Sequence, residues 1–248
     1  MLPATFLTKE VGNCFMFYNQ VVIIKKHERS FESHGEHLQS TQSEVSRQSL
    51  RVRSWTTIGR EKIADCRVFS VHKQVSTRTT GDSSETHDFF VFRPNDWVNV
   101  IPVTSDYQVV MIEQFRHGIE QITLEIPGGM IDLEETSTIA GRRELLEETG
   151  YCGDELVFLG RNHPNPAIQS NICDTFLSLN VQQTQVPIFN STEEVAIRLI
   201  PIKNIPALIK SGLITHALVI VAFHYLQQFC LDNKNAAGLD TDRLNPFS

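Results

Sequence analysis

The chain contains 248 residues, of which 41% are hydrophobic and 21% are charged, and its formal net charge is −7. This composition is typical of a globular protein with one large domain or two small ones. The acidic balance argues against a generic binder of nucleic acid or of membrane surfaces, because both need clustered Lys and Arg that face phosphates. We therefore expect neither kind of partner.

We expect no membrane span and no secretory signal peptide. Its longest nearly uncharged apolar stretch, Leu213 to Leu226, is shorter than the ~20 residues that a membrane-spanning helix needs. The five cysteines are scattered, lack CxxC spacing and follow no signal peptide. We expect free thiols in a reducing cytosol, and therefore a cytoplasmic protein.

The composition changes once, near residue 50. Residues 25–53 are dominated by polar and charged side chains, with too few apolar residues to offset the entropy of ordering them. We expect residues 1–54 to form a flexible segment. The apolar residues ahead of the polar stretch leave two alternatives open, a strand that docks on the protein or an upstream region read from the wrong start codon.

Strand signals follow, as short β-branched or aromatic runs separated by turn-forming residues. They lie at Val68 to Val75, Phe89 to Phe92, Val98 to Val103 and Val109 to Phe115. Further along, helical patterns cover Ser137 to Thr149 and Thr215 to Leu231, and strand patterns cover Leu156 to Leu159, Thr175 to Leu179 and Val195 to Ile200. A single α/β unit over residues 55–232 is the simplest account, followed by a polar tail at 233–248.

Three glutamates in the first predicted helix have a spacing that points to a metal. Glu144, Glu147 and Glu148 stand at i, i+3 and i+4, so their carboxylates share one helix face. Like charges in this arrangement repel unless a cation lies between them. Carboxylate oxygens suit Mg²⁺ or Mn²⁺. The alternative is an amphipathic surface helix with a solvated acidic face.

The residues that flank this helix support a tight local fold. Gly128 and Gly129 follow a proline and let the backbone turn sharply, which brings a carbonyl close to the metal. Thr136 is expected to cap the start of the helix, and Gly150 to end it in a left-handed conformation. Arg143 is expected to pair with Glu135 and so tie the preceding loop to the helix.

The spacing resembles a known motif over the whole of this segment. Gly129, five residues, Glu135, seven residues, and then the run from Arg143 to Tyr151 are similar to the complete Nudix box, with every one of its fixed residue types in place. The resemblance implies an α/β/α sandwich around a mixed sheet, with the box forming a loop, helix and loop. It also implies a metal-dependent hydrolase that cuts a nucleoside diphosphate linked to another group.

Roles carry over from this resemblance by position. Glu144 and Glu148 are the implied main metal ligands, Glu147 a further ligand or a catalytic carboxylate, and Gly128 a carbonyl ligand. Gly129, with Glu135, Arg143 and Gly150 named above, is implied to be structural. In the implied mechanism the metals polarise the diphosphate and activate a water that attacks one phosphorus in line. Mg²⁺ is the expected ion, with Mn²⁺ as the alternative.

The segments around the box are similar to the ADP-ribose and nucleoside diphosphate sugar pyrophosphatases. Arg116 then becomes a diphosphate-binding residue, and Glu125, in the lead into the box, and Pro166 become further candidates for substrate binding. Pro166 stands sixteen residues past Gly150, where a proline marks this group. For Arg116 the alternative is an ordinary surface arginine, and for Pro166 it is a plain turn.

One position departs from that group, in which a glutamate usually follows the proline by a few residues. The loop from His163 to Leu179 contains no glutamate, and Asn171 stands near the expected position. An amide cannot act as a base, so the base lies elsewhere or the substrate differs. Glu193 and Glu194 are the next candidates for the base, and a solvated loop is their alternative interpretation.

The resemblance also predicts a homodimer. Residues 55–97 are similar to the extra antiparallel sheet with which this group dimerises, ahead of a core at 98–232. An aromatic such as Trp97 can then stack on the substrate's base, although strand packing is the alternative. We expect hydrolysis of ADP-ribose or a related nucleoside diphosphate sugar. The alternatives are another dinucleotide or nucleotide sugar as substrate, or a non-catalytic regulatory protein that binds a nucleotide sugar.

Overall fold

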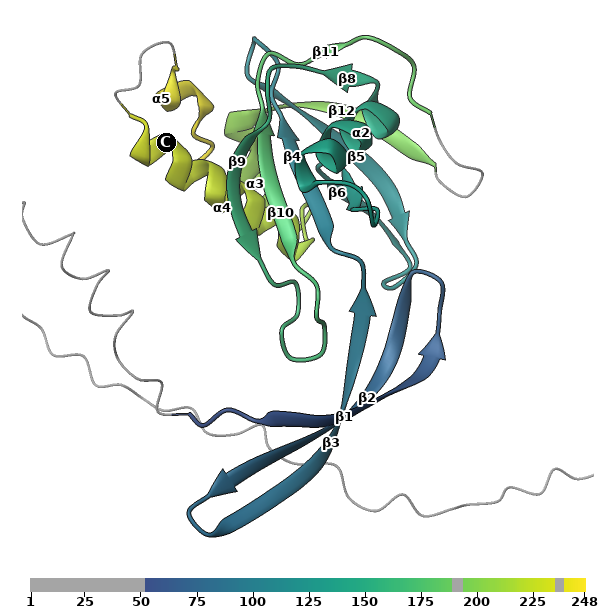
Figure 1. Cartoon of the computed structure of the whole chain (residues 1–248). Coiled ribbons are helices and arrows are strands. Elements are labelled where there is room, and N and C mark those ends of the chain that lie inside the picture. The colour runs from purple at the N-terminus through teal and green to yellow at the C-terminus, as the bar shows by residue number, and fades with distance from the viewer. Residues whose placement is uncertain (1–51, 189–193, 235–238) are drawn as a thin grey trace, which may run out of the picture. The chain divides into compact units, whose positions relative to one another are not determined.

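Three long antiparallel strands open the described part of the chain (Figure 1). They are β1 (Thr56–Asp65), β2 (Phe69–Thr80) and β3 (Ser83–Pro94), in the order β1-β2-β3. Gly81 makes the turn between β2 and β3 with a φ of 61°, a conformation that glycine adopts without strain. The computed structural model describes residues 52–188, 194–234 and 239–248. The prediction for residues 1–54 therefore lies almost entirely outside the described residues.

The remaining strands form two larger sheets and one small one, and these make the predicted mixed sheet arrangement. The larger sheets have the orders β7-β4-β10-β9 and β12-β5-β6, and β11 pairs with β8. β10 runs parallel to β4 and antiparallel to β9. The strands are β4 (Trp97–Pro102), β5 (Gln108–Arg116), β6 (Gln121–Glu125), β7 (Gly128–Met130), β8 (Tyr151–Cys152), β9 (Val157–Asn162), β10 (Cys173–Ser178), β11 (Gln182–Gln183) and β12 (Val195–Pro201).

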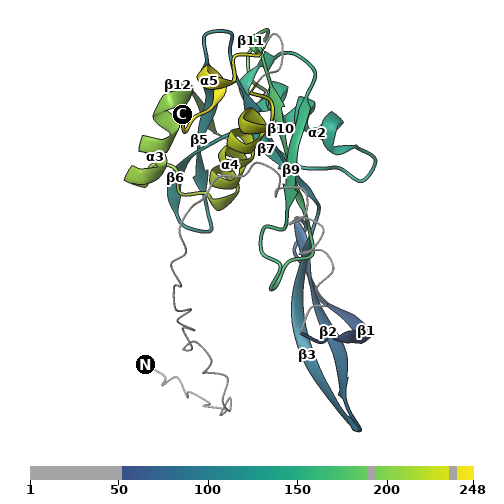
Figure 2. The ribbon, with the colours of Figure 1, turned by 90° about the vertical axis from the view of Figure 1, so that its left-hand side faces the viewer.

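Helices cover both faces of the β4–β10 pair (Figure 2). Side chains alternate between the faces of a strand, so Val98 and Phe176 pack on Ala140 of α2 (Ser137–Thr149). Ile101 and Leu177 belong to the larger core, which includes side chains of α4 (Ala217–Asp232). This layering confirms the predicted α/β/α sandwich.

The helix α2 has the residue bounds and both caps that the sequence predicts. Its N-cap Thr136 accepts a hydrogen bond from the backbone N–H of Ile139 through its side chain. Gly150 ends the helix with a φ of 71°. An added Cβ at Gly150 would lie 2.0 Å from the carbonyl oxygen of Gln185, so a side chain is excluded here by space as well as by conformation.

The end of the chain differs from the expected polar tail. Its described residues carry the short helix α5 (Thr241–Leu244), and Leu244 is fully buried in the core. Lys203 follows β12 in a 3-10 turn (Ile202–Asn204), and its Nζ donates hydrogen bonds to the carbonyl oxygens of Asp242 and Asn245. The segment is mostly polar in composition, but apolar side chains such as Leu244 pack in the core. A further helix, α3 (Ile205–Ser211), joins β12 to α4.

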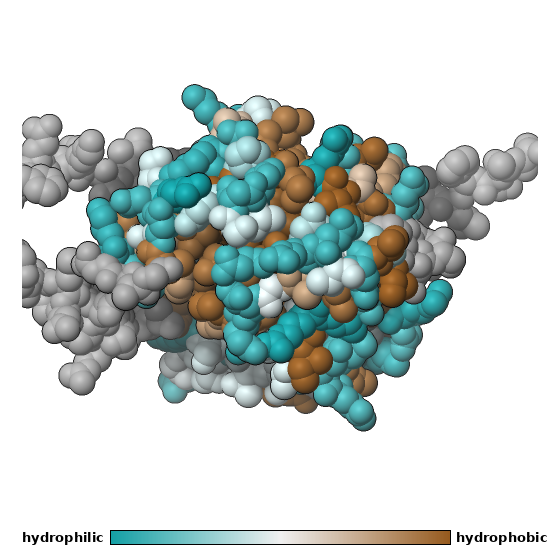
Figure 3. Space-filling view, turned by 90° about the horizontal axis from the view of Figure 1, so that it is seen from above, coloured by the Kyte–Doolittle hydropathy of each residue, from teal (hydrophilic) through white to brown (hydrophobic). Residues whose placement is uncertain are grey.

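Within the described residues, no helix is long and apolar enough to cross a membrane. Hydrophilic and hydrophobic residues interleave on the face seen from above (Figure 3). Several exposed apolar side chains lie on the β1–β3 sheet, among them Ile58, Ile63 and Phe90, which are 61%, 50% and 58% exposed. The described residues Arg53–Ser248 form one compact unit.

Candidate active site

The strand β7 brings the two glycines of the box against different neighbours. A Cβ at Gly128 would lie 2.3 Å from the carbonyl oxygen of Val98 on β4, because the two strands pair closely there. A Cβ at Gly129 would lie 2.3 Å from Oε1 of Glu144, a ligand candidate on α2. The first glycine is therefore required by the sheet, and the second leaves room for a carboxylate.

Arg143 joins the loop before α2 to the helix itself. Its Nε and Nη2 donate to the two carboxylate oxygens of Glu135 at 2.9 and 2.8 Å, which is the predicted bidentate pair. Its Nη1 donates to Glu144 at 2.9 Å and to Glu147 at 3.2 Å. Hydrogen bonding to Arg143 lowers the pKa of Glu135. One guanidinium therefore holds three carboxylates of the box in place.

The box carboxylates fit a hard divalent cation by their chemistry. Glu148 accepts a hydrogen bond from the backbone N–H of Gly128 at 2.9 Å, and the side chain of Glu144 is only 14% exposed. Carboxylate oxygens are the ligands that Mg²⁺ and Mn²⁺ prefer. Within the described residues, no three His, Cys, Asp or Glu side chains already converge at metal-binding distances. Glu144 and Glu148 have the carboxylate oxygens that could hold such an ion.

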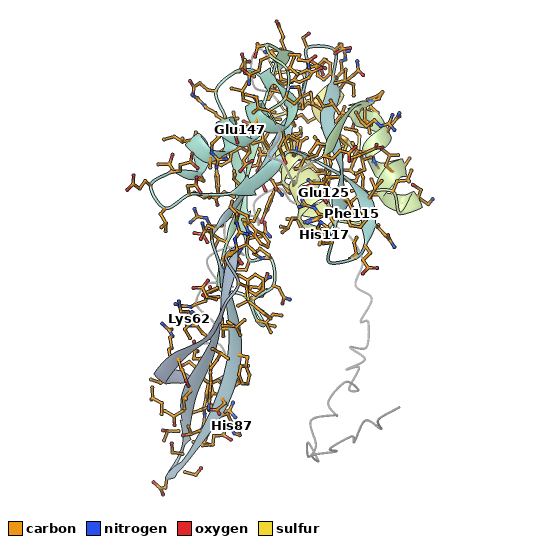
Figure 4. The ribbon with its side chains drawn as sticks, turned by 90° about the vertical axis from the view of Figure 1, so that its right-hand side faces the viewer. Lys62, His87, Phe115, His117, Glu125 and Glu147 are labelled. Atoms are coloured by element: carbon orange, nitrogen blue, oxygen red, sulfur yellow. The ribbon has the colours of Figure 1, made fainter. Side chains whose placement is uncertain are left out.

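A cleft of about 790 Å³ lies beside the glycines of the box. Segments far apart in the sequence form its walls: β4, the β5–β6 hairpin, β7 and the start of α4. Five of the predicted site residues line it, namely Trp97, Arg116, Glu125, Gly128 and Gly129. In Figure 4, Glu125 and His117 lie together at the hairpin, and Glu147 lies apart from them on α2. The two glycines are thus the link between the cleft and the acidic helix.

Arg116 and Glu125 form a bidentate ion pair in the wall of this cleft. The Arg116 Nε and Nη2 donate to the Glu125 carboxylate at 2.8 and 2.7 Å, and Thr123 donates to the same carboxylate at 2.6 Å. Glu125 is only 3% exposed. Burial alone would raise the pKa of Glu125, but the hydrogen bonds and charge of Arg116 outweigh it and lower that pKa. Glu125 therefore stays ionised and fixes the arginine in the cleft.

His216, which was not among the residues predicted from the sequence, lines the cleft from the N-terminus of α4. Its Nδ1 accepts a hydrogen bond from the backbone N–H of Leu218 at 3.2 Å and so caps the helix. Burial lowers the pKa of His216, the charge of Arg116 lowers it further, and Glu125 acts in the opposite direction. The available signal was a histidine directly before an apolar helical run.

Of the predicted residues outside the box, Pro166 and Glu194 lie away from the cleft lining. Pro166 belongs to the loop between β9 and β10, which docks on the end of β3 where the N–H of Phe92 donates to the carbonyl of Ile168. Glu194 is exposed directly before β12. Glu193 lies outside the described residues. The cleft lining thus gives neither Pro166 nor Glu194 a contact with a ligand bound there.

Asn171, which stands near the expected loop glutamate, is 2% exposed. Both polar atoms of its amide lack a hydrogen-bond partner within the described residues, and so does the buried hydroxyl of Thr175 on β10. The amide nitrogen of Asn99, which lines the cleft, also lacks one. Buried polar groups are usually satisfied by protein or by ordered water. Neither Asn171 nor Thr175 belongs to the cleft lining.

Comparisons with known proteins agree with this arrangement. The family model "NUDIX domain" matches residues 93–218. The chain is 26% identical to the ADP-ribose pyrophosphatase of Bacillus subtilis and 27% identical to the methanol dehydrogenase activator of Bacillus methanolicus. Each match spans 173 residues, which is 69% of this chain and 91% of the relative.

Among solved structures, one described as "Crystal structure of ADP compounds hydrolase" aligns with a TM-score of 0.64. Its sequence identity is 20%, and the alignment covers 75% of this chain and 99% of that one, so it shows a shared fold. The match to the family model covers half of the chain and includes the whole box. This confirms the predicted resemblance to Nudix hydrolases. The chain belongs to the NUDIX domain family.

Proposed function

We propose that the protein hydrolyses the diphosphate bond of ADP-ribose or of a related nucleoside diphosphate sugar in a metal-dependent reaction. Family membership makes it a Nudix pyrophosphohydrolase. The observation that carries the finer proposal is the cleft of about 790 Å³, which joins Arg116 to the glycines beside the box carboxylates. The ADP-ribose pyrophosphatase among its relatives supports the same substrate class.

Glu144 and Glu148 are the proposed metal ligands, with Glu147 and the carbonyl of Gly128 as further candidates. Mg²⁺ is the proposed ion, and Mn²⁺ is the alternative. When bound, such an ion supplies charge neutralisation and an activated water. The chain's own contribution is to hold the carboxylates in place before the ion binds, through Arg143 and the N–H of Gly128.

Arg116 is the proposed diphosphate-binding residue. Because Glu125 already fixes its guanidinium by two hydrogen bonds, Arg116 can meet an anion without first losing side-chain freedom. Glu125 thus acts as a positioning residue, although the sequence placed it among the substrate contacts. Trp97, in the cleft wall, is the proposed apolar surface for the ligand, while Pro166 is proposed to shape its loop.

The proton acceptor is proposed to be a glutamate near the box. Glu147 is 46% exposed and can reach solvent, and it shares Arg143 with Glu144. Glu193 and Glu194 remain the other candidates. Separate Gln substitutions at these three positions, compared by the pH dependence of kcat, identify the base, since only its loss removes the acidic limb of the profile.

Two further properties are proposed. The exposed apolar side chains of the β1–β3 sheet, including Phe90, support a homodimer formed through this sheet. The proposed cytoplasmic location depends on the scattered cysteines in the sequence.

A panel assay tests the substrate proposal. Purified protein is incubated with Mg²⁺ or Mn²⁺ and ADP-ribose, NADH, sugar nucleotides or dinucleoside polyphosphates. We expect ADP-ribose or a nucleoside diphosphate sugar to give the highest kcat/KM, with AMP and ribose 5-phosphate as products from ADP-ribose. A clear preference for dinucleoside polyphosphates would assign the chain to another group of Nudix substrates.

A regulatory role is the second candidate, because one relative is a methanol dehydrogenase activator. All the box carboxylates are present, which argues against a protein that binds its ligand without hydrolysing it. Saturable binding of ADP-ribose in calorimetry, without hydrolysis in either metal, would favour this candidate over the enzyme.

A further inference from the structure

We propose that His216 is a substrate-binding residue whose Nε2–H donates a hydrogen bond to a phosphate oxygen of the ligand in the cleft. The inference extends the proposed function, on which it rests, by adding a contact from α4 to those of the β5–β6 hairpin. The imidazole of His216 lines the same cleft as Arg116 and Gly128.

The helix cap determines which nitrogen of His216 is available. Nδ1 accepts a hydrogen bond from the N–H of Leu218, so it carries no proton, and in the neutral ring the proton lies on Nε2. Within the described residues, Nε2 makes no hydrogen bond to protein. Because the ring lines the cleft and the cap engages Nδ1, Nε2–H is the ring donor left for a ligand there.

The surroundings favour the uncharged form of this ring. Burial lowers the pKa of His216, and the nearby charge of Arg116 does the same, whereas Glu125 opposes them. Protonation of Nδ1 would also break the bond to Leu218. His216 is thus a neutral donor beside an arginine whose charge is already shared with a buried carboxylate.

A phosphate oxygen is the acceptor that suits this position best. The N-terminus of α4, a helix of 16 residues, carries partial positive charge and favours an anion. Arg116 adds a guanidinium group to the same cleft. The apolar side chains of Leu218 and Val219 line the cleft next to His216, and a less polar surrounding strengthens the hydrogen bond.

Two substitutions separate ligand contact from helix capping. In His216→Asn, the amide oxygen still accepts from Leu218, but the side chain stops short of the Nε2 position. In His216→Gln, the amide nitrogen reaches that position, but the cap is weakened. His224→Asn is the matched control, because His224 is exposed on the same helix.

Steady-state kinetics with ADP-ribose and Mg²⁺, and inhibition by inorganic pyrophosphate, provide the readout. In His216→Asn we expect KM and the pyrophosphate Ki each to rise ~10-fold, the loss typical of one hydrogen bond to a charged group. Its kcat and Tm should match those of the wild type. His216→Gln should recover most of the KM while its Tm falls, and His224→Asn should behave as the wild type.

The possible failures are distinguishable. If His216→Asn keeps the wild-type KM and Ki, His216 is only a helix cap, and the proposed hydrolysis still stands. A raised KM with an unchanged pyrophosphate Ki would place the contact on the sugar and overturn the phosphate assignment. If the wild-type protein hydrolyses no compound of the panel, the proposed function fails and this inference fails with it.

Discussion

Neighbouring glycines of the box face different atoms, and this predicts different effects for the same substitution. In Gly128→Ala the added Cβ meets a backbone oxygen of β4, which cannot move without disturbing the sheet. We expect a clear fall in Tm. In Gly129→Ala it meets the end of the flexible Glu144 side chain, so that carboxylate moves while the fold remains. We expect little change in Tm and at least ~10-fold lower kcat, as for a displaced catalytic group.

Thermal unfolding and kinetics of both variants check this contrast. Gly59→Ala is a suitable control, because its added Cβ would lie 3.8 Å from Val75, an ordinary contact distance. Equal losses of stability in the two box variants would show that Gly129 has only a structural role.

The pKa of His216 predicts a pH dependence of stability. This pKa is lowered from 6.5 in the folded protein, mainly by burial, so the unfolded chain binds the proton more readily. The contribution of His216 to stability is therefore present above pH 6.5 and is lost as the pH falls towards its folded pKa. The pKa of Glu125 is lowered from 4.5, so the contribution of Glu125 to stability is lost at more acidic pH than that of His216.

Urea unfolding at pH 7.5 and pH 5.5 measures this effect. We expect the wild type to lose more stability on acidification than His216→Asn does, since the other histidines titrate in both proteins. The same loss in both proteins would mean that His216 is not held neutral by the fold.

At the scale of elements, Arg143 is the connection between α2 and the loop before it. Arg143→Ala removes its hydrogen bonds to Glu135, Glu144 and Glu147 and leaves three carboxylates close together. We expect a lower Tm and a loss of activity. Arg143→Lys should recover only part of the Tm and part of the activity, since an ammonium cannot reproduce the bidentate contact with Glu135.

The adjacent Arg142 provides a matched control. It pairs with Glu155, and both side chains are largely exposed. Exposed ion pairs contribute little to stability, so Arg142→Ala should leave Tm and kcat nearly unchanged. A larger effect from Arg142 than from Arg143 in thermal unfolding would contradict the proposed role of the clamp.

Local signals explain which elements the sequence predicted well. The bounds of α2 follow from a threonine cap and a terminal glycine, each of which acts within one turn of the helix. β6 was missed because its five residues carry no strong turn signal and read as a lead into the box. α3 was missed because Pro206 suggests a break, although proline is well tolerated in the first turn of a helix.

The cleft itself could not be predicted, because its walls come from segments distant in sequence. Trp97, Arg116 and His216 lie on β4, β5 and at the start of α4, and only the folded chain brings them together. The box could be predicted because its carboxylates, glycines and arginine follow one another within a single loop and helix.

At the scale of the whole molecule, the exposed apolar residues of the β1–β3 sheet predict a dimer. Light scattering after size exclusion should give twice the chain mass of 28.1 kDa. Phe90→Glu should give the monomer mass, because Phe90 is 58% exposed in the single chain and an added charge there opposes burial against a second copy. Phe115→Glu, at a 49% exposed side chain on β5, serves as the control. A wild-type monomer would contradict this prediction.

The release of AMP from ADP-ribose with Mg²⁺, compared between the wild type and Glu148→Gln, tests the proposed function most directly. A glutamine at this position can still accept the hydrogen bond from the N–H of Gly128, so the fold should be kept while the proposed metal ligand is lost. We expect rapid release by the wild type, essentially none by Glu148→Gln, and wild-type rates for the exposed neighbour Glu134→Gln. Undiminished release by Glu148→Gln would contradict the assignment of the box carboxylates as the metal site.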